Sequence, residues 1–454
     1  MTPLWTAAEI AAATGVAAAG DFAVTGVAFD SREVGPGDLF VALSGEATDG
    51  HRFLPQAFAQ GAAGAIVSAP CDGPRVLVPD TFAALNALAR AARARTNAAV
   101  IGVTGSVGKT SAKEALSAAL ERGAPGRVHR SVKSYNNHTG VPLSLARMPR
   151  DSRFAVLEMG MNHAGELAAL TRLVQPDVAV VTNVGVAHIE FFDNEEGIAD
   201  AKAEIFQGLK PGGTAIVPFD SRHRERLIAA AEQHAARVVT FGTGEGSDVR
   251  AGEVMRTATG GNFVTARLHG RELNFTLAQP GAHHVANALA VLAAVEAVDG
   301  DLGLAGLALA ELGGLPGRGQ RFRTANGALV LDESYNANPA SMRATLAVLA
   351  DEPGRHVAVL GQMGELGEGS ADYHADLAAP VLAARVETAL LVGEAMVPLA
   401  TVLEQKVNVV HVADAAAAVA VLGDVVRPGD AVLVKGSNAV GLARVVAALA
   451  SGVG

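Results

Sequence analysis

Residues 100–111, VIGVTGSVGKTS, constrain the fold more than any other stretch of the chain. An apolar start precedes three glycines, then Lys109 and Thr110, then a helix-forming segment at 112–120. This is the order of a strand, a tight loop and a helix. Backbone N–H groups of such a loop can bind an anion, the lysine adds charge, and the hydroxyl can reach Mg²⁺. The stretch therefore predicts a cradle for a nucleoside triphosphate.

The glycine spacing of this loop is compact. A standard phosphate loop has a further glycine five positions before Gly108, where this chain has Val103. The alternative is an ordinary turn with a solvated lysine, but the order of strand, glycines, Lys-Thr and helix favours phosphate binding. The predicted ATP-binding residues of the loop are Gly105, Ser106, Val107, Gly108, Lys109, Thr110 and Ser111.

Composition limits the classes of protein that fit. With 454 residues the chain can hold two or three domains, and a net charge of -10 argues against nucleic-acid or acidic-membrane partners. Cys71 is the single cysteine, so no intrachain disulfide can form and a reducing compartment is expected. We see neither a signal peptide nor an apolar run of membrane-spanning length. A soluble, cytoplasmic, monomeric protein is expected.

Short apolar runs alternate with helical patterns along the whole chain, which predicts an α/β protein of three domains at 1–97, 98–314 and 315–454. The middle domain should be a parallel sheet, and the last an open sheet covered by helices on both faces. The strands are expected at 24–29, 38–43, 65–67 and 76–78, then 154–157 and 178–182, then 329–331, 356–360, 389–392, 407–412 and 431–434.

Two polar residues follow strands of the middle sheet. Glu158 ends one strand and His188 lies beyond the next, so both should approach a triphosphate held at the same edge. A solvated glutamate and a satisfied histidine are the alternatives, but the shared edge favours roles near a metal. Lys202, by its helical pattern alone, is expected to be a solvated surface lysine. His283 and His284 point about 100° apart on a helix and should be a poor chelating pair.

Several stretches together resemble the Mur ligase family. They are GVTGSVGKTS at 102–111, NNHTGVPLSL at 136–145, LEMGMNHAGEL at 157–167, TNVGVAHIEFF at 182–192, AKAEIF at 201–206, PGR at 316–318, LDESYNANPASM at 331–342 and LVKGSN at 433–438. EMGMNH and SYNANP are the most specific of these. The resemblance implies a domain for the UDP end of the substrate, a central ATPase domain and a Rossmann-like C-terminal domain that closes over the site.

The implied reaction joins UDP-N-acetylmuramoyl-tripeptide to D-alanyl-D-alanine, with ATP cleaved to ADP and phosphate through an acyl phosphate. The resemblance also implies residue roles. Lys109 would hold the β- and γ-phosphates, Thr110 one Mg²⁺, and Glu158 and His188 a second, helped by a carbamylated Lys202. Nucleotide contacts are implied for Asn287, Arg318 and Asn336, and substrate contacts for Ser31, Arg32, Asn136, Asn137, Asn338 and Lys435.

The chain departs from the family pattern at three places. His284 stands where the family usually has asparagine, and Gln362 stands where aspartate is common. The acidic residue before Ser334 is Glu333, which the resemblance makes catalytic, with Asp332 beside it as the alternative. Two other functions stay open: a ligase of the same superfamily that adds a different amino acid or acts on folate, and a P-loop ATPase or binding module without ligase chemistry.

Overall fold

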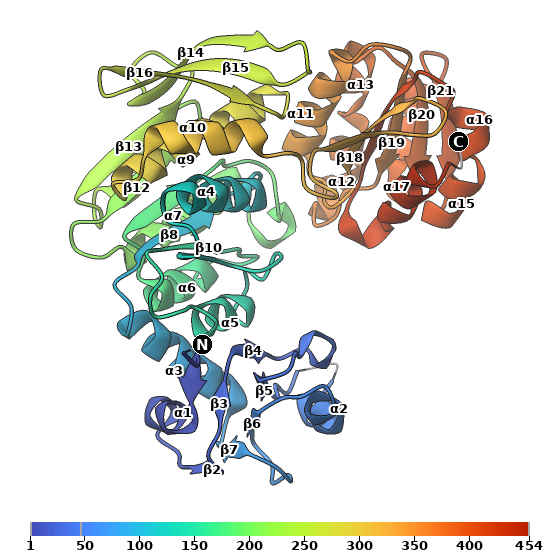
Figure 1. Ribbon diagram of the computed structural model, residues 1–454. Helices are drawn as coiled ribbons and strands as arrows, with labels where there is room; N and C mark the ends of the chain where they lie inside the picture. Colours follow the sequence, from blue (N-terminus) through green and yellow to red (C-terminus); the bar gives the residue numbers. More distant parts are fainter. Residues whose placement is uncertain (1, 46–47, 453–454) are drawn as a thin grey trace.

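The computed structural model describes residues 2–45 and 48–452, which form three successive α/β regions (Figure 1). The first region holds a five-stranded sheet in the order β2-β7-β6-β5-β4 and a separate pair, β1-β3. Its elements are β1 (Trp5–Thr6), α1 (Ala7–Thr14), β2 (Ala18–Ala19), β3 (Ala23–Val24), β4 (Gly26–Ala28), β5 (Asp38–Val41), α2 (Leu54–Ala59), β6 (Gly64–Val67), β7 (Arg75–Leu77) and α3 (Thr81–Ala94). The single strand predicted at 24–29 is therefore wrong, because β3 and β4 belong to different sheets.

The central region is built on a nine-stranded sheet, β16-β15-β14-β13-β12-β11-β8-β10-β9. Its strands are β8 (Ala99–Thr104), β9 (Val128–Arg130), β10 (Phe154–Glu158), β11 (Val178–Val181), β12 (Thr214–Pro218), β13 (Arg237–Gly242), β14 (Val249–Arg256), β15 (Asn262–Leu268) and β16 (Arg271–Leu277). Its helices are α4 (Lys109–Gly123), α5 (Gly140–Ala146), α6 (Glu166–Val174), α7 (Glu195–Ala203), α8 (Arg224–Ala231), α9 (Ala282–Ala297) and α10 (Leu302–Glu311).

Two apolar cores cover the two faces of this central sheet. Residues of α4, α9 and α10 pack on one face, and residues of α5 to α8 on the other. The strands from β9 to β14 pair in parallel as predicted, whereas β14, β15 and β16 form an antiparallel extension that the sequence patterns did not reveal.

The C-terminal region contains the six-stranded sheet β17-β18-β22-β19-β20-β21, with α11 to α14 on one face and α15 to α17 on the other. This confirms the predicted open sheet with helices on both faces. Its elements are β17 (Gln320–Arg323), β18 (Leu329–Glu333), α11 (Pro339–Ala350), β19 (His356–Gly361), α12 (Ser370–Ala375), α13 (Ala378–Ala383), β20 (Val386–Val392), α14 (Val397–Leu403), β21 (Asn408–Val412), α15 (Ala415–Ala420), α16 (Leu422–Val425), β22 (Ala431–Lys435) and α17 (Ala443–Ala450).

The carboxyl ends of strands from two sheets face one another. In the central sheet β8 lies between β10 and β11, so the phosphate loop, Glu158 and the segment after β11 share one edge. In the C-terminal sheet the last residues of β18 and β22, Glu333 and Lys435, are paired in register. Figure 1 shows the C-terminal region beside the central region, with the chain passing from one to the other after α10. Among the helices of the described residues, none has the length and apolar character needed to cross a membrane.

Candidate active site

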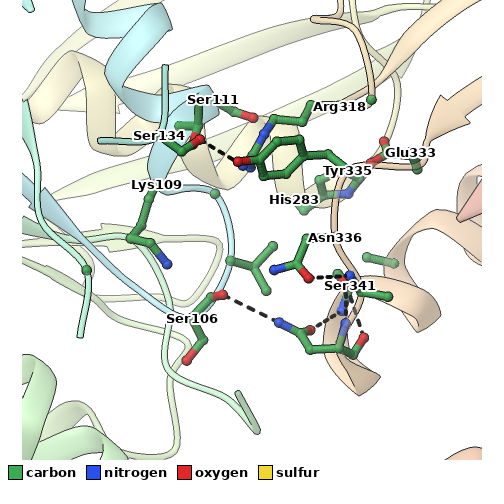
Figure 2. A pocket seen from close by; sticks show the side chains of 18 of the residues that line it. Ser106, Lys109, Ser111, Ser134, His283, Arg318, Glu333, Tyr335, Asn336 and Ser341 are labelled. Carbon is green, nitrogen blue, oxygen red and sulfur yellow. Dashed lines mark hydrogen bonds between the residues drawn. The ribbon is translucent and has the colours of Figure 1, made fainter. Parts of the chain in front are cut away.

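A cavity of about 300 Å³ lies between the central and C-terminal regions. Figure 2 shows Lys109 and Ser106 on one side of it and Arg318, Glu333, Tyr335 and Asn336 on the other. Most of the residues expected to form the site line it: Ser106, Val107, Gly108, Lys109, Thr110, Ser111, Asn136, Glu158, His188, Asn287, Arg318, Glu333, Asn336, Asn338 and Lys435. The structure thus gathers side chains that are up to 329 positions apart (435 − 106) around one space.

The phosphate loop has a backbone that needs its glycines. Gly105 and Gly108 have φ angles of 151° and 89°, in the region that disfavours other residues. A Cβ atom on Gly108 would lie 2.7 Å from Oδ1 of Asn287, so this glycine also permits the close approach of α9. Helix α4 begins at Lys109, three residues before the predicted start, and its N-terminus opens on the cavity. Free N–H groups and the helix dipole favour an anion there.

A buried hydrogen-bonded group follows this loop. The hydroxyl of Thr110 donates to Oε2 of Glu158 at 2.9 Å, and Nδ2 of Asn136 donates to Oε1 at 2.8 Å. Glu158 is 1% exposed, so its carboxylate is fixed by these partners. The ammonium of Lys113 lies 3.9 Å from the same carboxylate and donates to the carbonyls of Ser131 and Lys133. Sequence reasoning missed Lys113, which lies one helical turn after Lys109.

Lys202 is buried, so its prediction as a solvated surface lysine is wrong. It is 2% exposed, and no other described residue forms a hydrogen bond or ion pair with its amine. Burial, and then the charge of Lys109, lower the pKa of Lys202 well below the usual value. A buried amine without an anionic partner is unfavourable. The residue lies outside the lining of the cavity, on the side of Lys109.

Positive charge exceeds negative charge around the cavity. Burial lowers the pKa of Lys109, an effect that Glu158 opposes, and the nearby charge of Arg318 lowers it further. Burial also lowers the pKa of Lys435. The basic residues that line the cavity are Lys109, Lys435 and Arg318, and the acidic ones are Glu158 and Glu333. The cavity lining is therefore positive, although the net charge of the whole chain is -10. This field favours a multiply charged anion.

The C-terminal wall is organised by a stacked arginine. The guanidinium of Arg318 lies 3.9 Å from the ring centroid of Tyr335, and its Nη2 donates to Oγ of Ser134 at 3.4 Å. The preceding turn is held by Asp332, whose carboxylate accepts from the backbone of Gly317 at 2.7 Å and from the hydroxyl of Ser334 at 2.6 Å. Asp332 therefore shapes the connection between the regions, whereas its neighbour Glu333 lines the cavity.

Glu333 lies among basic groups. Burial raises the pKa of Glu333, and the ammonium of Lys435, 3.9 Å away, opposes that rise. The rings of His283 and His284 contact one another with centroids 4.1 Å apart, and ligand atoms of both lie within 4.8 Å of Glu333. Both histidines lie in the first turn of α9 and pack beside Glu333 of the C-terminal region. That they make a poor chelating pair stays a prediction.

Asn338 connects the two regions directly. Its Oδ1 accepts from the backbone of Ser341 and so caps α11, while its Nδ2 donates to the carbonyl of Ser106 in the phosphate loop at 3.4 Å. Asn336 receives a hydrogen bond from Lys435 on its carbonyl at 2.9 Å. The loop between β18 and α11 thereby lies across the mouth of the phosphate loop (Figure 2).

Some predicted residues lie apart from the cavity. Ser31 is buried and donates to Gln56, and Arg32 is exposed and pairs with Asp30 in the first region. Oδ1 of Asn137 accepts from the backbone N–H of Gly140, the first residue of α5, at 2.9 Å. Gln362 bonds to the segments after β20 and β22 and has no place in the cavity lining. The substrate roles of Ser31, Arg32 and Asn137 stay predictions.

Family models match the chain almost from end to end. The Mur ligase family catalytic domain matches residues 23–125, the Mur ligase middle domain 103–295, and the Mur ligase glutamate ligase domain 317–438. The UDP-N-acetylmuramoyl-tripeptide–D-alanyl-D-alanine ligase of Escherichia coli is 37% identical over 434 residues, which cover 94% of each chain. This chain belongs to the Mur ligase family.

Solved structures agree with this assignment. MurF from Acinetobacter baumannii has a TM-score of 0.87 and 32% identity, covering 98% of this chain and 99% of its own. MurF ligase from Thermotoga maritima, solved in complex with ADP, has a TM-score of 0.81 and 28% identity, covering 94% and 97%. This Mur ligase therefore has the family's three-domain architecture, and the cavity described above lies at the junction of its last two domains.

Proposed function

We propose that this Mur ligase joins the tripeptide carboxylate of UDP-N-acetylmuramoyl-tripeptide to the amine of D-alanyl-D-alanine, with ATP converted to ADP and phosphate. The observation that carries the proposal is the cavity in which Lys109 and Thr110 of the central domain face Arg318 and Lys435 of the C-terminal domain. The similarity to ligases named for this reaction supports it. We expect the enzyme to act as a cytoplasmic monomer.

The chemistry divides into two steps. The tripeptide carboxylate attacks the γ-phosphorus of ATP, forming an acyl phosphate and releasing ADP. The amine then attacks the acyl carbon, and the resulting tetrahedral intermediate expels phosphate. The first step brings two anions together, the carboxylate and the triphosphate. Fixed positive groups stabilise the negative charge of its transition state and so lower the barrier. Lys109 and Arg318 are placed to supply that charge, with Arg318 held in orientation by its stacking on Tyr335.

The donor set beside the phosphate loop fits Mg²⁺. This ion prefers oxygen ligands and few protein groups, and the hydroxyl of Thr110 and the buried carboxylate of Glu158 meet both conditions. A bound Mg²⁺ would shield the phosphate charge. We propose that Thr110 serves one such ion, and that Glu158 and His188 serve a second, helped by a carbamate on Lys202. Carbamylation would replace the unpaired buried amine with an anion near Lys109.

The remaining contacts follow from position. Asn287 touches the phosphate loop from α9, and Asn336 lies between that loop and Lys435, so both are proposed to bind the nucleotide. Glu333 is proposed to be a catalytic residue in the cavity wall. Asn136, Asn338 and Lys435 are proposed to contact the substrates. Ser31 and Arg32 are proposed to hold the UDP end of the substrate, and Asn137 is proposed to contact the substrate beside Asn136.

The test is phosphate release from ATP by the purified chain, with each component omitted in turn. Release that requires both UDP-N-acetylmuramoyl-tripeptide and D-alanyl-D-alanine, with a UDP-pentapeptide detected by mass, is the expected result. Release with a single amino acid in place of the dipeptide would identify another ligase of the superfamily. Turnover of ATP alone, indifferent to the UDP-sugar peptide, would identify an ATPase without ligase chemistry.

A further inference from the structure

One buried lysine has no part in the chemistry proposed above. Lys113 lies on α4, one turn after Lys109, and its side chain is fully buried. Its ammonium donates to the carbonyl of Ser131 at 3.0 Å and to the carbonyl of Lys133 at 2.7 Å. It also forms an ion pair with Glu114 at 3.0 Å. A lysine ammonium has three protons, so these three groups can engage all of them.

The alternative role for Lys113 is to neutralise the buried carboxylate of Glu158. The two charged groups lie 3.9 Å apart, beyond hydrogen-bond distance. Glu158 already accepts from Thr110 and Asn136. The short contacts of the ammonium go instead to carbonyls of residues 131–136, the segment after β9, here called the bridging loop. Lys113 is therefore bound mainly to this loop.

The bridging loop contacts both outer domains. Toward the first domain, the ammonium of Lys133 and the hydroxyl of Tyr135 both donate to Oε1 of Glu33, the hydroxyl at 2.7 Å. Toward the C-terminal domain, Oγ of Ser134 accepts from Arg318 at 3.4 Å, and Figure 2 shows these two side chains at the cavity. A displacement of this one loop would therefore disturb contacts with both outer domains.

The backbone of the bridging loop needs support. Lys133 has a φ of 52°, a left-handed value that is uncommon for a residue with a side chain. Such a conformation persists only where the surrounding structure holds it. The buried Ser131 is held by β10, since its N–H donates to Val156 and its Oγ accepts from the N–H of Glu158. The carbonyls on both sides of this turn converge on Lys113, and a buried acceptor that loses its partner is destabilising.

We propose that Lys113 is a positioning residue whose ammonium fixes the bridging loop, and through it the contacts with Glu33 and Arg318. The inference rests on the proposed function insofar as Asn136 of this loop contacts the substrate there. Lys109 and Lys113 lie one turn apart on the same helix, so α4 holds the phosphate loop and the bridging loop at a fixed spacing. One helix thereby sets where the nucleotide lies relative to the substrate.

The first test reads the loop without turnover. The chain has three tyrosines, so fluorine-19 NMR of the full chain labelled with 3-fluorotyrosine gives three signals, which phenylalanine variants assign. Tyr135 lies in the bridging loop, and Tyr335 carries the stacked arginine. Tyr373 packs against the core of the C-terminal domain and serves as the internal reference. Lys113→Met should shift or broaden the first two signals and leave the third as in wild type.

Ser117→Ala is the matched control for this test. Ser117 is a buried polar residue one turn further along α4, and its hydroxyl has no hydrogen-bond partner among the described residues. Its three signals should match wild type. Lys113→Gln keeps a donor for one carbonyl and should give smaller shifts than Lys113→Met. An unchanged Tyr135 signal in folded Lys113→Met would overturn the proposal. If neither Lys113 variant folds, the lysine supports the domain rather than the loop, and the proposal fails.

The second test separates positioning from loss of structure. Lys113→Met should raise KM for UDP-N-acetylmuramoyl-tripeptide at least about tenfold, with KM for ATP changed less than about threefold, and Lys113→Gln should fall between this variant and wild type. A protein that is only partly folded would lower kcat and leave both KM values unchanged, and that pattern would overturn the proposal. Absence of ligase activity in the wild type would count against the proposed function and leave the fluorine NMR test intact.

Discussion

The side chains of Thr110 and Glu158 meet at 2.9 Å between the first turn of α4 and the carboxyl end of β10. One belongs to the phosphate loop and the other to the neighbouring strand, so the contact exists because β8 and β10 pair in parallel. Nδ2 of Asn136 binds the second carboxylate oxygen and completes a rigid group of oxygen donors.

Glu158→Gln should weaken metal binding while leaving the fold intact. The amide keeps an oxygen that can accept from Thr110 but removes the negative charge that a divalent cation needs. We expect the affinity for Mn²⁺ in the presence of ADP, measured by electron paramagnetic resonance, to fall at least about tenfold. The same substitution at the exposed Glu225 is the control. An unchanged Mn²⁺ affinity would remove Glu158 from the metal site.

Lys109→Ala should abolish ATP turnover without unfolding the protein. Its ammonium contacts the carbonyl of Gly105 at 2.7 Å and faces the cavity, so its loss removes charge stabilisation rather than core packing. A fall in kcat of at least about 100-fold is expected, with the thermal midpoint shifted by less than about 3 °C. Lys210→Ala, at a surface lysine of the same domain, should keep full activity. Retained turnover in Lys109→Ala would refute the phosphate cradle.

Lys202→Ala should lose turnover and regain part of it with added formate or acetate. The reason is that a small carboxylate can occupy the space of a lost carbamate and restore its negative charge. Carbon-13 NMR after incubation with labelled bicarbonate should give a carbamate signal in wild type that is missing from the variant. A variant that is fully active, or a wild type without that signal, would exclude carbamylation.

The stability of the protein should fall in mild acid, partly through His129. Burial lowers the pKa of His129 to about 4, although the carbonyl of Ser144 accepts a hydrogen bond from its ring at 2.7 Å. Because the unfolded chain binds this proton near pH 6.5 and the folded chain does not, stability is full above pH 6.5 and declines as the pH falls toward 4.

His129→Gln is the variant that isolates this contribution. We expect the loss of unfolding free energy between pH 7 and pH 5, from urea titrations, to be smaller in the variant by about 1 kcal/mol. The side chain is half-buried, so the figure allows for screening by solvent. Parallel curves for the two proteins would show that His129 is not the group responsible.

Local patterns located the phosphate loop, Glu158 and His188, because the order of strand, glycines and helix is a short-range property. The other predicted cavity residues came from the family resemblance: Asn136, Asn287, Arg318, Glu333, Asn336, Asn338 and Lys435. The carboxyl ends of parallel strands meet at one edge, which made Glu158 and His188 identifiable. The strand endings were less predictable: β18 and β22 extend to Glu333 and Lys435, which their polar character had placed in loops. Pairing with a neighbouring strand overrides that local preference.

Other features depend on contacts that no local pattern contains. Lys202 lies on a helix of mixed polarity, and its burial comes from the packing of α7 with α6 and α8 on one face of the central sheet. His283 and His284 lie close to Glu333 because the C-terminal domain packs against the start of α9. The family resemblance, rather than periodicity, pointed to Lys202.

The hydrogen bond from Asn338 to the carbonyl of Ser106 means that the walls of the cavity are shared between two domains. An inhibitor that fills the cavity therefore contacts both domains at once. Its residence time would depend on how long the two domains stay together as well as on its own contacts. Compounds selected for binding to the isolated central domain would lack this advantage, so screening on the full-length enzyme is the better route to slow dissociation.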